Sequence, residues 1–119
     1  PLKNSAKNNP PIGNAGWGLA NFFNEKGEPT SELKADYGIR YLRKNKTVVR
    51  DDVQVVNREG DTLTTEKLTW DEQSNQIFTD EFVKVKTPEE IIYAQGLKSN
   101  PSFTDYEFYN IEGTIQVED

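Results

Sequence analysis

The sequence predicts an all-β protein, a single antiparallel domain of the β-jelly-roll or twisted-boat type. Apolar and polar residues alternate over short runs, which places side chains two positions apart on one face of a strand. Turn-forming clusters recur about every ten residues, a spacing typical of sandwiches and jelly rolls. No long run of the sequence has the periodicity of an amphipathic helix.

Residues 60–97 show this pattern most clearly. Three strands are expected here, over residues 63–70, 76–85 and 90–97, with a polar turn after the first and Pro88 before the third. The first run could also form one helical turn, but its threonines favour a strand because β-branched residues are poor helix formers. We expect these strands to form consecutive hairpins around which the rest of the chain packs.

Strands are also expected on both sides of this array, and a leader before it. Residues 1–18 are rich in Asn, Pro, Gly and Lys, which predicts a flexible leader ahead of a folded domain over residues 19–119. Apolar residues occupy successive odd positions in residues 32–41, which predicts one continuous strand there. Strands are also expected over residues 48–56 and 110–117; the apolar cluster of Trp17, Leu19, Phe22 and Phe23 is a candidate edge strand, and residues 103–108 are rich in aromatic side chains.

One apolar stripe is the main candidate site. If the strands pair in sequence order, its members share one face by their parity, and Trp70, Val83 and Tyr93 should face the same interior. Such a stripe is either a closed sandwich core or the lining of a trough for acyl chains. Its members are Tyr37, Ile39, Tyr41, Val53, Val55, Leu68, Trp70, Val83, Val85, Ile91 and Tyr93.

The composition argues against several classes of function. A formal net charge of −6 disfavours nucleic-acid binding, which needs a basic stripe. The chain has no histidine and no cysteine, so it lacks the commonest general base, the commonest metal ligand and any thiolate nucleophile. We therefore expect no catalytic residue, no metal site and no cofactor, and no hydrolytic or transferase activity.

The carboxylates do not change this view. Asp51 and Asp52, Asp80 and Glu81, and the two glutamates after Pro88 are adjacent in sequence. Neighbouring residues of a strand point to opposite faces, so such pairs do not converge on one substrate. They are expected to be solvated charges in turns or on edge strands, where they discourage aggregation.

The order of elements resembles a known family. The run N-x-x-G-D-x-L-x-T-E-x-L-x-W-D over residues 57–71 is followed by a short turn, by IFTDEFVKV at 77–85, and by a strand ending in Gly96 and Leu97. This arrangement resembles the periplasmic domain of LptC, a component of the lipopolysaccharide export (Lpt) system. The resemblance extends upstream through residues 27–57 and downstream to NIEGTI at 110–115, covering roughly residues 22–117.

The resemblance implies a fold, a function and partners. The domain would have an open, V-shaped hydrophobic interior, and the stripe would bind lipid. The protein would be a non-enzymatic carrier in the periplasm, tethered to the inner membrane through an anchor upstream of residue 1. It would take lipopolysaccharide from an LptBFG-type ABC transporter and pass it to an LptA-type bridge protein towards the outer membrane.

The last expected strand is the candidate partner edge. It carries no proline and one charge, so it is suited to β-augmentation or edge-to-edge self-association, with Gly113 marking a bulge or a close backbone approach. Its members are Asn110, Ile111, Gly113, Ile115 and Val117.

Two alternatives remain open from the sequence. Basic residues concentrate between positions 34 and 50, either as solvated charges or as contacts for phosphate or sugar at the rim. The rival function is that of a periplasmic or cell-surface β-sandwich that binds carbohydrate or protein. A closed, packed interior with aromatic residues outside would favour this rival, and an open apolar trough would favour lipid transfer.

Overall fold

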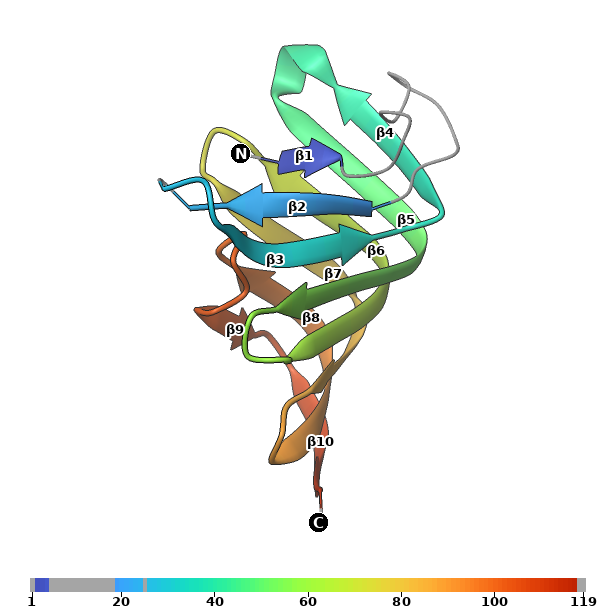
Figure 1. The fold of residues 1–119 in the computed structure, drawn as a ribbon. Coiled ribbons are helices and arrows are strands. Elements are labelled where there is room, and N and C mark those ends of the chain that lie inside the picture. Colours follow the sequence, from blue (N-terminus) through green and yellow to red (C-terminus); the bar gives the residue numbers. More distant parts are fainter. Residues whose placement is uncertain (1, 5–18, 25, 118–119) are drawn as a thin grey trace.

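The computed structural model describes residues 2–4, 19–24 and 26–117, and they form an all-β domain (Figure 1). The prediction of an antiparallel all-β fold is confirmed. One short 3-10 turn, η1 (Leu42–Lys44), interrupts the strands. The strands are β1 (Leu2–Asn4), β2 (Leu19–Phe23), β3 (Pro29–Lys34), β4 (Tyr37–Tyr41), β5 (Lys46–Asn57), β6 (Thr62–Asp71), β7 (Gln76–Lys86), β8 (Glu90–Ser99), β9 (Tyr106–Phe108) and β10 (Ile111–Gln116).

All of these strands belong to one sheet that is not closed. Its order is β1-β2-β3-β5-β6-β7-β8-β10, so β1 and β10 lie at opposite ends of the path. β5 pairs with β4 along its first half and with β3 along its second half. β8 is shared in the same way between β10 and β9. In Figure 1, β1, β2 and β3 cross in front of the long strands, so the sheet folds back on itself into two layers.

A line of irregularities, here called the crease, crosses the four long strands. The register shifts after Arg50 on β5, after Thr65 on β6 and after Thr79 on β7, and Gly96 of β8 has a positive φ of 103°. Bulges bend a strand and increase its twist. Because four irregularities lie side by side, each long strand can bend there and contribute residues to both layers.

Two of the adjacent acidic pairs in the sequence lie in the crease. Asp51 and Asp52 adopt left-handed φ angles of 67° and 53°, and Asp80 and Glu81 occupy the shift between β7 and β8. All four side chains are exposed. Asp tolerates the left-handed region better than most residues, and a bulged residue needs no cross-strand partner. These two pairs are thus solvated, as expected, but they lie in bulges of central strands instead of turns or edges, whereas Glu89 and Glu90 lie in the turn before β8 and at its first position.

The core lies between the layers and is built from the inward positions of nearly every strand. Phe22 of β2 meets Trp70 of β6 edge to face across the interior, with ring centroids 5.4 Å apart, although their strands are not neighbours in the sheet. The other buried apolar residues are Leu33, Ala35, Val49, Val53, Val55, Leu63, Leu68, Ile77, Val83, Val85, Ala94, Leu97 and Phe103.

Polar contacts tie the loop after β8 to two other segments of the chain. The loop after β8 reaches β3, where Ser31 Oγ donates to the Pro101 carbonyl at 2.6 Å. It also reaches the β5–β6 turn, where Asn57 Nδ2 donates to the Phe103 carbonyl at 2.7 Å. Each bond satisfies a polar side chain that is almost fully buried, so its loss would leave an unpaired group inside. We call these contacts the junction.

The N-x-x-G-D part of the sequence run forms part of this junction. Asn57 Oδ1 accepts from the backbone N–H groups of Glu59 and Asp61, which is the geometry of an Asx turn. Gly60 takes the positive φ of 90° that the turn requires. One asparagine therefore shapes the β5–β6 turn and ties it to the β8–β9 loop.

Two expectations about strands were wrong. The short β1 lies within the expected leader and pairs with β2, so β2 is an inner strand and not an edge. The expected strand over 32–41 is two strands, because the chain bends after Lys34 and the Asp36 N–H bonds to the Asp51 carbonyl. Within the aromatic-rich residues 103–108, Tyr106–Phe108 form β9. The remaining expected leader residues lie outside the described part of the chain.

Candidate functional site: the sheet interior and its open edge

The stripe residues of β5, β6 and β7 lie inside the domain, as the alternation predicted. Val53, Val55, Val83 and Val85 are each 0% exposed. Leu68 and Trp70 lie on the same inner face, because they pair with Val49 and with the buried Thr47 across β5. The stripe residues of these three strands therefore face the interior.

The stripe residues of β4 lie on the opposite, outer face, which corrects the prediction. Gly38 is the β4 residue opposite the buried Val49, so Tyr37, Ile39 and Tyr41 point the other way. The cause is the bend between β3 and β4, which shifts the parity relative to Leu33 and Ala35. Tyr41 is 42% exposed, which a lining residue of a closed interior would not be.

The stripe residues of β8 are also on the outer face. Val83 pairs with Ala94 and Val85 pairs with Ile92, so Ile91 and Tyr93 lie on the face opposite to Val83. The expectation that Tyr93 shares a face with Val83 and Trp70 is wrong. The bulge at Gly96 changes the parity within β8, so that Leu97 is inside while the odd positions before it are outside.

One inner row runs across the sheet to its edge. Following the register, Leu33 pairs with Val55, Val55 with Leu63, Leu63 with Val85, and Val85 with Ile92. The first four are at most 1% exposed, whereas Ile92 is half-buried. Ile92 in turn pairs with Thr114 of β10. The apolar interior thus extends to the strand at the end of the sheet and becomes accessible there.

The interior is packed in this structure. Its apolar side chains are almost inaccessible to solvent, and Trp70 Nε1 is buried with no hydrogen-bond partner among the described residues. The buried polar side chains are mainly hydroxyl and amide groups, and Asp61 is the acidic member. Acyl chains would therefore have to displace the layers from each other, most directly by separating Phe22 from Trp70.

β10 is an edge strand, and of the two features expected at Gly113 the structure shows the bulge. The register with β8 shifts between Ile111 and Gly113, which leaves Glu112 without a cross-strand partner. Ile111 and Ile115 are 61% and 54% exposed. Such exposure on a strand paired on one side is suited to the addition of a further strand.

A model of the family described as "Lipopolysaccharide-assembly, LptC-related" matches residues 20–110. The chain belongs to the LptC-related family. No curated protein gave a match to it. The LptC family acts in lipopolysaccharide transport and outer membrane biogenesis together with other Lpt components, through a periplasmic domain, and it is not known as a family of enzymes.

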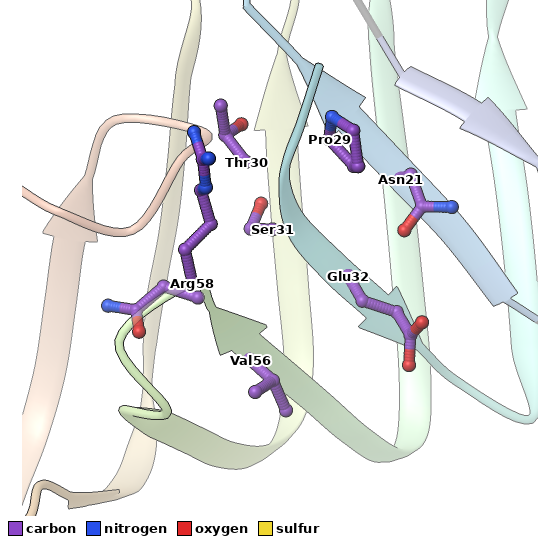
Figure 2. A pocket seen from close by; sticks show the side chains of 8 residues that line it. Asn21, Pro29, Thr30, Ser31, Glu32, Val56 and Arg58 are labelled. Atoms are coloured by element: carbon purple, nitrogen blue, oxygen red, sulfur yellow. The ribbon is translucent and has the colours of Figure 1, made fainter.

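The LptC-related domain has a cleft of about 420 Å³ beside the junction (Figure 2). Side chains of β2, β3 and the end of β5 line it, among them Asn21, Ser31 and Val56. Its most buried polar groups are already paired within the protein. Thr30 Oγ1 donates to the Phe22 carbonyl and accepts from Ser102 Oγ, and Ser31 bonds to Pro101. The cleft is therefore an element of the junction, and its buried hydroxyl groups are not held ready for a ligand.

Among the described residues of the LptC-related domain, no group of three or more Asp or Glu side chains is placed to hold a metal ion.

The pKa of one tyrosine is shifted: burial and the nearby Asp61 carboxylate raise the pKa of Tyr106 to about 12. Its hydroxyl donates to Asp61 Oδ2 at 3.4 Å, so the neutral form is the one that the junction favours. Within the same described part of the chain, no helix is long and apolar enough to span a bilayer.

The sequence reasoning missed Ile92 and the second half of the inner face of β8. The run EIIYAQGL is apolar at neighbouring positions, so alternation alone allows either face. A glycine inside a strand pattern was the available signal, because it commonly marks a bulge that changes parity.

Proposed function

We propose that this domain carries lipopolysaccharide without catalysis, receiving it from an LptBFG-type inner-membrane transporter and passing it to an LptA-type bridge protein. The observation that supports this most directly is the inner apolar row from Leu33 to Ile92, which crosses the sheet and ends beside β10. Acyl chains crossing an aqueous compartment need continuous apolar contact, at roughly 25 cal/mol per Å² of buried surface.

The unclosed sheet gives a physical route for loading. The layers meet through side chains such as Phe22 and Trp70 and through the junction, and no backbone ladder joins β1 to β10 in the described sheet. Separating the layers on the side away from the junction therefore breaks no strand pairing. Ile92 is the half-buried member of the inner row, and we infer that acyl chains enter between the layers beside it.

β10 is the proposed site for the bridge protein. The domain itself would be tethered to the inner membrane. A strand added to β10 would extend the sheet and would bring a second apolar face into line with Ile92 and Val85. The same open edge also permits edge-to-edge self-association. The transporter would then meet the sheet at its other end, near β1 and β2.

The packed interior is the observation that favours the rival function, a β-sandwich that binds carbohydrate or protein on its surface. Exposed aromatic residues on the outer face, such as Tyr41, Phe82 and Tyr109, agree with it. Membership of the LptC-related family favours lipopolysaccharide carriage. The two functions differ in which face of the sheet contacts the ligand.

Photo-crosslinking distinguishes the two faces. Probes at Leu63, Val85 and Ile92 report on the inner row, and matched probes at Thr64 and Lys84 report on the outer face of the same strands. Each variant is first checked for folding by circular dichroism. Under the proposal, lipopolysaccharide crosslinks to the inner probes and most strongly to Ile92. Crosslinks confined to outer probes, in folded variants, would contradict carriage through the interior.

A further inference from the structure

A groove on the outer face of the sheet, opposite the apolar interior, is lined by lysine and aromatic residues. It has a volume of about 280 Å³ and lies across β4, β5, β6 and β7. Val48, Thr69 and Phe78 form its floor as one cross-strand row. We call it the outer groove.

Three lysines line the outer groove and give it positive charge. They are Lys44, Lys46 and Lys67; no acidic residue lines the groove, and none of these lysines makes an ion pair within the described part of the chain. Asp71 is opposite Lys46 in the register, but its Oδ1 accepts from the Gln73 N–H within its own turn. In a protein of net charge −6, this is a local excess of positive charge.

Two like charges are also directly opposite each other at one end of the groove. Arg50 pairs with Lys67 across β5 and β6. Directly opposed like charges are unfavourable in a sheet, and this pair adds to the positive charge of the face that carries the groove. Arg50 packs over the Tyr37 ring at 4.0 Å from its centroid, which holds the guanidinium on this face.

The groove is held in shape by neighbouring contacts. Asn45 takes a left-handed conformation that ends η1, and its carbonyl accepts from the Glu72 N–H at 2.9 Å. Arg40 Nη2 bonds to Glu72 Oε1 at 3.3 Å. These bonds fix the backbone of the β4–β5 turn from which the side chains of Lys44 and Lys46 extend.

We propose that the outer groove binds a phosphorylated sugar. Lysine ammonium groups bind phosphate through charge-assisted hydrogen bonds. Tyr41, which is 42% exposed, and the half-buried Phe78 offer ring faces on which the apolar face of a sugar ring can pack. The site is on the opposite face from the acyl-chain row, so this proposal does not depend on carriage through the interior.

Nuclear magnetic resonance titration of the labelled chain tests the proposal. The probes are lipopolysaccharide core oligosaccharide freed of acyl chains, the same glycan after phosphatase treatment, a hexose phosphate and inorganic phosphate. We expect the phosphorylated glycan to shift the amides of Val48, Thr69 and Phe78. Lys67→Gln and Lys46→Gln should each weaken its binding about fivefold or more. Lys84→Gln, an exposed lysine on the outer face of β7 away from the groove, is the matched control and should bind as wild type does.

Comparing the titration probes distinguishes the possible sources of the sugar. Tighter binding of the core oligosaccharide than of the hexose phosphate assigns a lipid head group, and equal binding assigns a free sugar phosphate. The proposal is overturned if the dephosphorylated glycan binds equally well, if inorganic phosphate binds as tightly as the sugars, or if Lys67→Gln and Lys46→Gln behave as Lys84→Gln does. The inner-row crosslinks are read separately, so either proposal can fail alone.

Discussion

Gly96 and Tyr109 are in contact at the crease, and the contact leaves no room for a side chain on the glycine. A Cβ on Gly96 would lie 2.7 Å from Tyr109 Cδ2 and 3.3 Å from the Thr79 carbonyl oxygen. The Tyr109 N–H donates to the Gly96 carbonyl at 3.2 Å, so the same residue pair also joins the β9–β10 connection to β8. The bulge that changes the parity of β8 therefore depends on a glycine for two reasons, its φ of 103° and this contact.

Gly96→Ala should lower the free energy of unfolding by about 2 kcal/mol, because it combines an unfavourable φ with the clash. Gly60→Ala is the matched control, since Gly60 has a φ of 90° but a Cβ added to it would meet no atom within 4 Å. It should cost only about 1 kcal/mol. Chemical denaturation measures both.

The clash can be isolated by removing the ring. Tyr109→Ala in the Gly96→Ala background should recover the difference between the two glycine variants, measured as a double-mutant cycle. Equal losses for Gly96→Ala and Gly60→Ala, with no coupling to Tyr109, would show that the contact does not constrain β8.

Val83→Asp should unfold the domain or cost at least about 3 kcal/mol, because Val83 is 0% exposed and the substitution buries an unpaired charge. Lys84→Asp changes the neighbouring exposed residue and should stay within about 0.5 kcal/mol of wild type. Thermal unfolding followed by circular dichroism compares them. A stable, folded Val83→Asp variant would mean that the interior opens to water at this position.

We expect the domain to lose stability at high pH because of the raised pKa of Tyr106. Its folded pKa of about 12 lies above the value of 10.0 for a free tyrosine, so the folded state holds a proton that the unfolded state releases. Stability from this residue is fully present below pH 10, and it is lost as the pH rises from about 10 to about 12. Denaturation at a series of pH values should show this fall.

Tyr106→Phe is the control for that measurement. Without the phenol group, the decline attributable to this residue should disappear, and the phenolate absorbance that appears near pH 12 should be lost. An identical pH profile in the variant would assign the decline to other groups.

Thr114→Pro tests β10 as the proposed docking edge. The Val117 N–H donates to the Glu89 carbonyl, so by alternation the N–H groups of Ile115 and Gly113 point at β8, whereas those of Thr114 and Gln116 point away from it. Proline at Thr114 or Gln116 therefore removes a donor that only a partner strand would use. Pull-down of the bridge protein should drop in both variants while the fold is retained.

Ile115→Pro supplies the contrast, because it breaks the ladder with β8 and should lower stability itself. If folded Thr114→Pro and Gln116→Pro variants both retain the bridge protein at wild-type levels, β10 is not the docking edge.

The strands and much of the interior follow from the local pattern of the amino-acid sequence. The alternation of apolar and polar residues predicted the strands β5, β6, β7 and β8. It also predicted the inward positions Val53, Val55, Leu68, Trp70, Val83 and Val85. It further found the edge character of β10 and the bulge at Gly113. These features are predictable because the direction of a side chain follows from its position within one uninterrupted strand.

Features that depend on breaks in that alternation emerged only from the folded chain. The bend between Lys34 and Tyr37 and the bulge at Gly96 each reverse the parity, which moved Tyr37, Ile39, Tyr41, Ile91 and Tyr93 to the outer face. A change of one position in register exchanges the two faces of a strand, and nothing in the alternation itself records where that change occurs. The outer groove arises in the same way, since Arg50 and Lys67 become neighbours only when β5 and β6 pair.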